Sequence, residues 1–347
     1  MLDISHAQTQ RIQKVINQWS ANGGDASTLI SNLEKNEELK EILLEETPWV
    51  LEGKDESEQK RRLALLFDFN RSESAREVAL QKLIWLQEDN GGWSWFKGFP
   101  ASRSITLSIL RGMARLVELN AIQYGETEKE MQIKALNFLD KSIEMDYNNL
   151  KKHNRKWQND LPSGEQLEYL FVRSYYRDIP EYGSAREAIR FYSYQAERNW
   201  QKFDLKGKAE IAMLTNRNGK RDIALSILTW LRNRATNSEE MGFYWANNIG
   251  YSDWLSSPIS THCLMMRAFD EISPNRGDTD AMKRWLLSQK RTQKWESVPA
   301  TVDAIQELLM NGNDWISDSN RCVIGWGDTT INSVNGELGT GYIKTGA

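Results

Sequence analysis

Hydrophobic residues spaced three and four positions apart run through most of this chain, a pattern that predicts amphipathic α-helices. Prolines and clusters of Ser or Thr fall between the periodic segments, where helices commonly start or stop. We therefore expect an all-α protein with about twelve to fourteen helices between residues 5 and 312. The clearest stripes are Thr106, Ile109, Leu110, Met113, Leu116 and Val117; Leu136, Leu139 and Ile143; and Val298, Val302, Ile305, Leu308 and Leu309.

A tryptophan phrase occurs three times within this helical pattern. Segments 85–93, 230–245 and 285–295 each begin with Trp-Leu, pass through a short loop and end on a second tryptophan. An amphipathic segment enters each phrase, and another follows it after a Ser, Thr or Pro cluster. Recurring helix–loop–helix units are typical of repeat architectures, because one unit cannot bury its apolar face alone. The phrase predicts successive helix pairs, with Trp93, Trp245 and Trp295 at the joints.

The last thirty residues have a different character. Segments 321–327 and 339–344 are short, glycine-rich and β-like, with turn residues between them. Two such strands are too few for an independent sheet. We expect a helical domain over residues 1–314, and a β stub over 315–347 that opens a following, truncated β domain.

Composition excludes several function classes. The 347 residues carry a formal net charge of −4, and 27% of them are charged. The sequence lacks the clustered basic residues of a nucleic-acid-binding face, so no nucleic-acid partner is expected. No apolar run approaches the ~18–20 residues that span a bilayer, and no signal peptide opens the chain. Cys263 and Cys322 do not form the spaced pattern of a disulfide framework. One disulfide between them is possible and two free thiols are favoured, and neither outcome shows in which cellular compartment the protein lies. The 14 tryptophans favour helix packing, with a sugar- or peptide-binding floor as the alternative.

The repeated phrase, followed by Gly and an aromatic residue, resembles the helix-pair repeat of α/α toroids. Terpenoid cyclases, protein prenyltransferase β-subunits and the thioester domains of complement and α2-macroglobulin proteins share that shape. The chain is most similar to the last group, in its large bacterial form. The resemblance implies an inner ring of helices wrapped by an outer ring. The segments that carry it, in order, are 41–50, 63–68, 89–95, 240–245, 283–301 and 339–344.

The internal thioester of that family is not expected here. It requires a Cys thiol and a Gln in a Cys-Gly-Glu-Gln-like motif, because sulfur makes the acyl group reactive enough for a target nucleophile. The nearest match, 163–166, carries Ser163 in place of the cysteine, and we interpret it as a helix N-cap. Neither cysteine is followed by Glu-Gln. The turn at 23–26, which is comparable in position to the family's motif, has no sulfur.

Metal-dependent toroid chemistry also lacks its residues, so no metal or cofactor is expected. Asp278 and Asp280 are the nearest candidates for an Asp-rich magnesium or acid motif, but they lie ahead of a helix, where acids commonly cap. His262 and Cys263 are adjacent and would point about 100° apart on a helix. A core or loop pair is therefore favoured over a zinc site. With only three histidines, a multi-histidine centre is excluded.

A glycoside hydrolase with a Trp-lined cleft is the alternative. Such an enzyme needs two carboxylates about 5–10 Å apart across the cleft. Asp89, and Glu239 or Glu240, lie near the tryptophans of two phrases and could supply them, although acids in loops are usually solvated. If any of the tryptophans contacts a partner, Trp93 and Trp95 beside the Gly-Gly loop are the candidates.

The favoured function is a non-catalytic scaffold or interaction domain. The family resemblance implies a periplasmic, cell-envelope or extracellular protein that inhibits endopeptidases. The full-length protein would trap a protease sterically after a bait segment is cut, without a covalent link. Its expected partners are proteases and the neighbouring β domains of the same chain. We expect no enzymatic activity.

Overall fold

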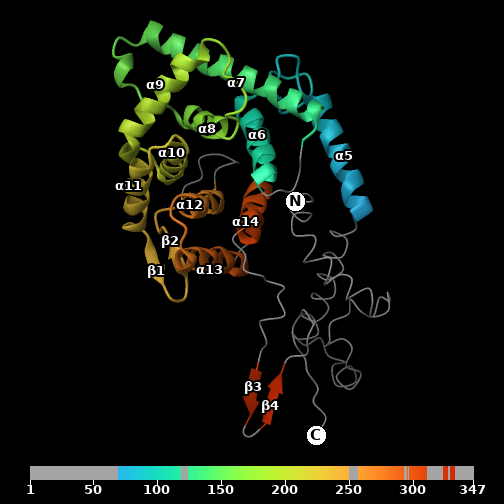
Figure 1. Cartoon of the computed structure of the whole chain (residues 1–347), viewed down its shortest axis with the longest axis vertical. Helices are drawn as coiled ribbons and strands as arrows, with labels where there is room; N and C mark the ends of the chain where they lie inside the picture. The colour runs from blue at the N-terminus through green and yellow to red at the C-terminus, as the bar shows by residue number, and fades with distance from the viewer. Residues whose placement is uncertain are drawn as a thin grey trace. The chain divides into compact units, whose positions relative to one another are not determined.

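The computed structural model describes residues 69–118, 124–249, 257–292, 295, 297–310, 323–326 and 329–332 (Figure 1). Several segments used in the sequence analysis lie outside these residues: the turn at 23–26, the segments 41–50, 63–68 and 339–344, and Cys322. Within them the chain forms ten α-helices and two small antiparallel sheets, which confirms the all-α class with a short β segment. The expected total of about twelve to fourteen helices includes residues outside this range.

The elements follow one another as helix pairs joined by short connections. None of the described helices is both long and apolar enough to cross a bilayer. The bounds are α5 Phe69–Leu86, α6 Arg103–Glu118, α7 Glu126–His153, η2 Trp157–Asn159, α8 Gly164–Arg173, α9 Ala185–Arg198, η3 Trp200–Lys202, α10 Leu205–Arg217, α11 Arg221–Arg232, β1 Thr236–Ser238, β2 Gly242–Tyr244, α12 Pro258–Ile272, α13 Arg276–Thr292, α14 Val298–Met310, β3 Val323–Trp326 and β4 Thr329–Asn332.

The chain divides into two compact units, and Leu80–Asn311 forms the helical one. The expected boundary between residues 314 and 315 stays a prediction, because residues 311–322 lie outside the described part. The β-like character of 321–327 is confirmed for β3. Its partner is the neighbouring strand β4, and the antiparallel register runs from Val323 opposite Asn332 to Trp326 opposite Thr329.

The helical unit is a ring of helix pairs. The even-numbered helices α6, α8, α10, α12 and α14 contact one another in turn, and the odd-numbered helices α7, α9, α11 and α13 pack outside them (Figure 1). Arg115 of α6 pairs with Asp303 of α14, so the inner series closes on itself. This arrangement is the one that the repeated phrase predicts.

Burial follows the two layers. Inner helix α10 is buried around most of its circumference, and its small residues Gly207, Ala209 and Ala212 allow its neighbours to approach closely. Outer helix α9 buries one face only, which includes Ala188 and Tyr192. Helices that are apolar all round belong in an interior, and amphipathic ones cover it.

Each inner helix starts at a side chain that caps its free backbone N–H groups. Caps of this kind typically stabilise a helix by about 1 kcal/mol each. In each case the side-chain oxygen accepts a hydrogen bond from a backbone N–H two or three residues further on. The predicted Ser boundaries are thus confirmed at Ser102, Ser163, Ser257 and Ser297. The remaining inner helix, α10, is capped by Asp204.

The tryptophan phrase forms the joint between an outer helix and the next inner one. The indole Nε1 of Trp93 donates to the carbonyl oxygen of Leu83 at 2.9 Å, in the last turn of α5. Trp245 does the same to Leu231, also at 2.9 Å, in the last turn of α11. Both rings are buried. The predicted joint role is therefore confirmed for these two, and Trp295 packs against the same core as Trp245.

A glycine in each of the first two phrases lets the loop rest on the next outer helix. Gly91 and Gly242 have φ angles of 92° and 79°, in the left-handed region that favours glycine. A Cβ at Gly91 would lie 2.2 Å from the carbonyl oxygen of Lys134 in α7. A Cβ at Gly242 would lie 2.0 Å from that of Ala281 in α13. The same backbone contact thus recurs at two joints of the ring.

Helix α14 presents a different face to the core than its apolar stripe suggests. The helix itself is confirmed, but Val298 is 78% exposed, and Val302, Ile305 and Leu308 are only partly buried. Its most buried positions are small or polar, because this face turns toward the charged interior of the ring. They are Ala300, Asp303, Ala304, Gln306 and Glu307.

Replacing Gly242 by alanine is expected to lower the free energy of unfolding by about 3 kcal/mol or more, because the new Cβ meets a helix backbone that cannot retreat. Gly219→Ala is the matched control: its φ of 77° is almost the same, yet a Cβ there meets nothing within 4 Å. The control is expected to lose only about 1 kcal/mol, the penalty of the left-handed backbone. Urea unfolding of both variants measures the difference, and equal losses would contradict the close contact.

Candidate functional site

The interior of the ring carries charged side chains, although it is the place where apolar residues would be expected. Every inner helix contributes at least one, and all are between 2% and 9% exposed. Groups of this kind are almost never buried unless they are paired. They are Arg111 and Arg115 of α6, Glu168 of α8, Glu210 of α10, Arg267 of α12, and Asp303 and Glu307 of α14.

Helix α6 is joined by ion pairs to both of its neighbours in the ring. Arg111 Nη1 lies 3.0 Å from Glu168 Oε1 of α8. On the other side, one turn along, Arg115 Nη1 is bonded to Asp303 Oδ1 of α14. The spacing of four residues places both guanidiniums on the inward face of α6. The first and last inner helices are thus linked through charge.

A second pair joins α12 to α14, where Arg267 Nη2 lies 2.5 Å from Glu307 Oε1. Lys206 at the start of α10 adds a contact of 3.4 Å to Glu168. The ion pairs thus connect each inner helix to another across the interior.

The environment shifts the pKa values of the acids in opposite directions. Burial by itself would raise the pKa of Asp303, but Arg115 and Arg111 hold it below its usual value. Burial raises the pKa of Glu307, against the opposing charge of Arg267. Cys263, nearby on α12, has a pKa well above the usual thiol value because of its burial. Its thiol is therefore protonated and unreactive.

Glu210 is the interior acid that retains its proton at neutral pH. Burial raises its pKa to about 8, and the nearby Glu168 adds to this, while Lys206 and Arg111 act in the opposite direction. Its Oε1 has no hydrogen-bond partner among the described residues. With Glu210 neutral, the seven interior residues present three guanidiniums and three carboxylates, so their charges balance.

His262 and Cys263 lie together in the core of α12, as the core-pair interpretation expects. The Nε2 atom of His262 lies 3.0 Å from the carbonyl oxygen of Met282, and its ring centroid is 4.2 Å from that of Trp285. Burial lowers its pKa to about 4, so the imidazole is neutral. The described part of the chain holds no group of three or more His, Cys, Asp or Glu residues that could bind a metal ion.

Asp278 and Asp280 belong to the start of α13. Asn275 accepts the backbone N–H groups of residues 277 and 278, and so caps this helix. Asp278 forms an ion pair with Arg232. Asp280 lies 3.3 Å from Lys283. The two acids therefore lie within the first turns of α13 rather than ahead of it, and the capping role expected of them belongs to Asn275.

Ser163 begins α8 in a complete capping box. Its Oγ accepts from the backbone N–H of Gln166 at 3.3 Å, and its own N–H donates to Gln166 Oε1 at 3.0 Å. This reciprocal pair satisfies two backbone donors at once. The N-cap interpretation of residues 163–166 is confirmed.

The acids of the glycosidase alternative lie on separate loops. Asp89 follows α5, and Glu239 and Glu240 form the turn between β1 and β2; all three are exposed. Figure 1 shows these two loops at different sides of the ring. The structure therefore does not bring the three acids together as a facing pair.

Of the two tryptophans considered for partner contact, Trp93 is 1% exposed and has no surface to offer. That candidate is corrected: its ring is held in the core by the bond to Leu83. Trp95 is 52% exposed, beside the exposed rings of Phe96 and Phe99. A partner contact at Trp95 stays a prediction.

Sequence reasoning overlooked the interior charges. The sequence does carry a signal for them: three inner helices each have two charged residues spaced four positions apart, which is about one helical turn. They are Arg111 and Arg115, Lys206 and Glu210, and Asp303 and Glu307. On a solvated helix such residues would lie on the polar face, and the sequence does not reveal that this face turns inward.

An open pocket of about 720 Å³ lies at the carboxyl-terminal ends of α6, α8 and α10. Tyr175, Tyr176 and Arg217 are part of its wall. Arg217 is held there by Glu271, at 2.7 Å, and its guanidinium carbon lies 3.9 Å from the ring centroid of Tyr175. At this end too, the guanidinium already has a carboxylate partner.

Comparisons with known proteins give a distant likeness among solved structures. No protein-family model and no curated protein matches the chain. Among solved structures, Salmonella alpha-2-macroglobulin reacted with methylamine matches with a TM-score of 0.45 and 14% sequence identity. The match covers 80% of this chain and 16% of that one, so the chain spans a small part of that protein's length. A likeness at this level carries no argument about function.

Replacing Arg115 by methionine is expected to lower the free energy of unfolding by about 3–5 kcal/mol, because Asp303 is left as a buried charge without its nearest partner. Asp303→Asn in the same chain should recover part of that loss, giving a coupling energy of about 1–3 kcal/mol. Chemical denaturation of the four members of the cycle measures it. Lys134→Met, which breaks an exposed pair with Glu130, should lose less than about 0.5 kcal/mol. Additive effects at Arg115 and Asp303 would contradict a direct pair.

Stability is also expected to depend on pH through Glu210. The unfolded carboxyl loses its proton near 4.5 and the folded one near 8, so the folded state binds more protons between these values. The free energy of unfolding should therefore fall with rising pH, by about 2 kcal/mol between pH 6.5 and 8.5. At pH 6.5 the unfolded His262, with its usual pKa of 6.5, is half charged while the folded one is neutral, which offsets this fall by about 0.4 kcal/mol. Glu210→Gln should remove the slope and the exposed control Glu130→Gln should keep it; an unchanged slope in Glu210→Gln would refute the assignment.

Proposed function

We propose that this chain is a non-catalytic scaffold and interaction domain. The observation that supports this most strongly is the set of buried ion pairs between the inner helices. Enzymes built on helical toroids need an open cleft with reachable acids or metal ligands. Here the interior carboxylates Glu168, Asp303 and Glu307 are buried and lie against guanidiniums. Such groups hold helices together, and each would have to give up its ion pair to act on a substrate.

The finer part of the proposal is that the domain belongs to a bacterial α2-macroglobulin-like protein without a thioester. The sequence resemblance supports it, and the residues present fit a thioester-free version. Ser163 is committed to a helix cap, and Cys263 is a buried, protonated thiol. Trapping of an endopeptidase would then be steric. A periplasmic, cell-envelope or extracellular location, and contact with neighbouring β domains, are part of the same proposal.

The test uses the full-length protein that contains this chain, incubated with trypsin. Trypsin should retain its activity on a small chromogenic peptide and lose most of its activity on casein, because a steric cage excludes only large substrates. No covalent conjugate should appear on a denaturing gel, and native migration should change after cleavage. Methylamine should add no mass, since no thioester is present to open.

Two results would contradict the proposal. Trypsin that digests casein as fast with the protein as without it would rule out steric trapping. Hydrolysis of a polysaccharide that is lost in Glu240→Gln would favour the glycoside hydrolase instead. A Lys134→Met variant serves as the control for nonspecific effects of substitution, because its side chain is exposed.

A further inference from the structure

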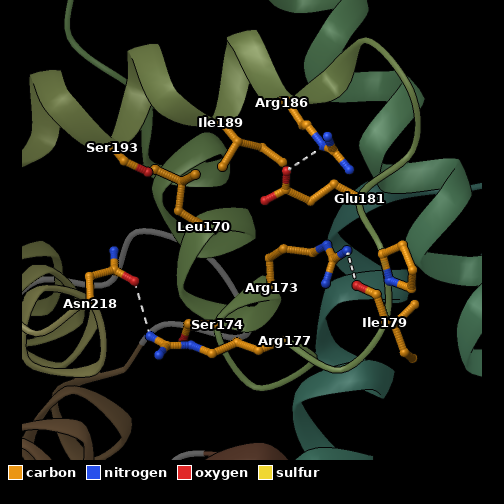
Figure 2. Close-up of a pocket in the computed structure, with 11 residues that line it drawn as sticks. Leu170, Arg173, Ser174, Arg177, Ile179, Glu181, Arg186, Ile189, Ser193 and Asn218 are labelled. Atoms are coloured by element: carbon orange, nitrogen blue, oxygen red, sulfur yellow. Dashed lines mark hydrogen bonds and ion pairs between the residues drawn. The ribbon is translucent and has the colours of Figure 1, made fainter.

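A second pocket lies where α8 ends and α9 begins, beside the pocket of about 720 Å³, with which it shares Ser174 and Ile179. Its volume is about 350 Å³ (Figure 2), within the range of small-ligand sites. All of its lining residues belong to the stretch 124–249, which the structure describes without a gap. Three arginines from α8, from the loop after it and from α9 contribute to the lining, with one carboxylate, Glu181.

Arg173 forms the fixed floor of this pocket. It is 6% exposed, and its guanidinium donates to the carbonyl oxygens of Tyr176 at 2.5 Å and Ile179 at 2.8 Å. Its Nε lies 3.3 Å from Asp140. The charge of Arg173 is therefore matched, and its contacts hold the loop in the shape that makes the pocket.

Arg177 has no such partner. Its guanidinium donates to the amide oxygen of Asn218 at 3.0 Å, and no carboxylate of the described residues lies within ion-pair distance (Figure 2). The adjacent acid in sequence, Asp178, lines the other pocket. An arginine held by a neutral amide retains its full charge and can exchange that partner for an anion.

Arg186 adds a second cation on the opposite side of the pocket. Its Nε lies 3.5 Å from Glu181; the Arg186 side chain is 64% exposed and that of Glu181 36%. Exposed pairs of this kind contribute little and rearrange readily. The lining residues include three guanidiniums and one carboxylate. Asp140, which lies behind Arg173, neutralises a second guanidinium, so the pocket has a net charge of one positive unit.

The remaining wall is apolar. Leu170, Ile179, Pro180 and Ile189 line it, and Figure 2 shows Leu170 and Ile189 to the left of Arg173 and Arg186. A free inorganic anion would use the guanidiniums and leave this wall in contact with water. A ligand with an apolar body would cover it, which is favourable by about 25 cal/mol per Å² of apolar area buried.

We propose that this pocket binds a small organic anion: a carboxylate carried on a compact apolar body. The carboxylate pairs with Arg177, for which the fork of a guanidinium is the suitable donor. Arg186 adds positive charge on the opposite side of the pocket. The apolar body lies against Leu170 and Ile189. The proposal concerns the joint between α8 and α9 and is independent of the scaffold role of the interior.

The test measures binding to the 347-residue chain by isothermal titration and by ligand-observed NMR. The probe is N-acetyl-leucine, with N-acetyl-leucinamide as the partner that lacks the carboxylate and inorganic phosphate as the one that lacks the apolar body. N-acetyl-leucine should bind one site with a Kd on the order of 1 mM. The amide and phosphate should each bind at least about tenfold more weakly.

Variants assign the site. Arg177→Gln should weaken the binding of N-acetyl-leucine by about tenfold or more, and Arg186→Gln by a smaller factor. Arg198→Gln is the matched control, because Arg198 lies on the same helix α9, is exposed and bonds only to Tyr194 among the described residues. It should leave the binding unchanged. Circular dichroism should be the same for all three variants.

Four results would overturn the proposal. The first is no binding of N-acetyl-leucine at 10 mM, which is about tenfold above the expected Kd. The second and third are equal binding by the amide, which would mean an apolar pocket only, and equal binding by phosphate, which would mean a simple anion site. The fourth is an effect of Arg198→Gln as large as that of Arg177→Gln. Each of them is read out by binding alone, so none bears on the function proposed for the interior.

Discussion

The ion pairs between inner helices are the interaction on which the rest of this structure depends. Arg115 with Asp303 links the first and last inner helices, and Arg267 with Glu307 joins α12 to α14. Burying such pairs is expensive in desolvation, so their net gain over an apolar core is small. Their geometric demand is strict, however, because a lost partner leaves a bare charge in the core. We infer that they set the order and register of the ring more than its total stability.

The same charges determine what the ring can do. A side chain that holds a helix in place through an ion pair is not available as an acid, base or ligand without breaking that pair. The neutral Glu210 is the exception in protonation state, but it too is buried among Lys206, Arg111 and Glu168. This commitment of the interior residues to ion pairs is the ground for the scaffold role proposed above.

The sequence predicts most of this fold and little of its interior. Helices, their Ser caps and the tryptophan joints follow from local rules, because each depends on residues close together in the chain. The hydrogen bond from Trp93 to Leu83, ten residues away, is an example of such a local contact. The pairing of Arg115 with Asp303 joins positions 188 residues apart, and no local pattern encodes it. For the same reason the apolar stripe of α14 points to the wrong face: hydropathy assumes an apolar interior.

The distribution of paired and unpaired charges also indicates where a ligand can bind. Inside the ring, every guanidinium lies against a carboxylate, and a ligand would have to displace one. In the pocket after α8, Arg177 is held only by the amide of Asn218, and an incoming carboxylate replaces a neutral partner with a charged one. That exchange gains electrostatic energy and removes no ion pair. The loop that carries Arg177 is fixed from below by Arg173, so binding there requires little reordering of the chain. The joint between α8 and α9 is thus the part of the ring that can gain a contact without losing one that the fold needs.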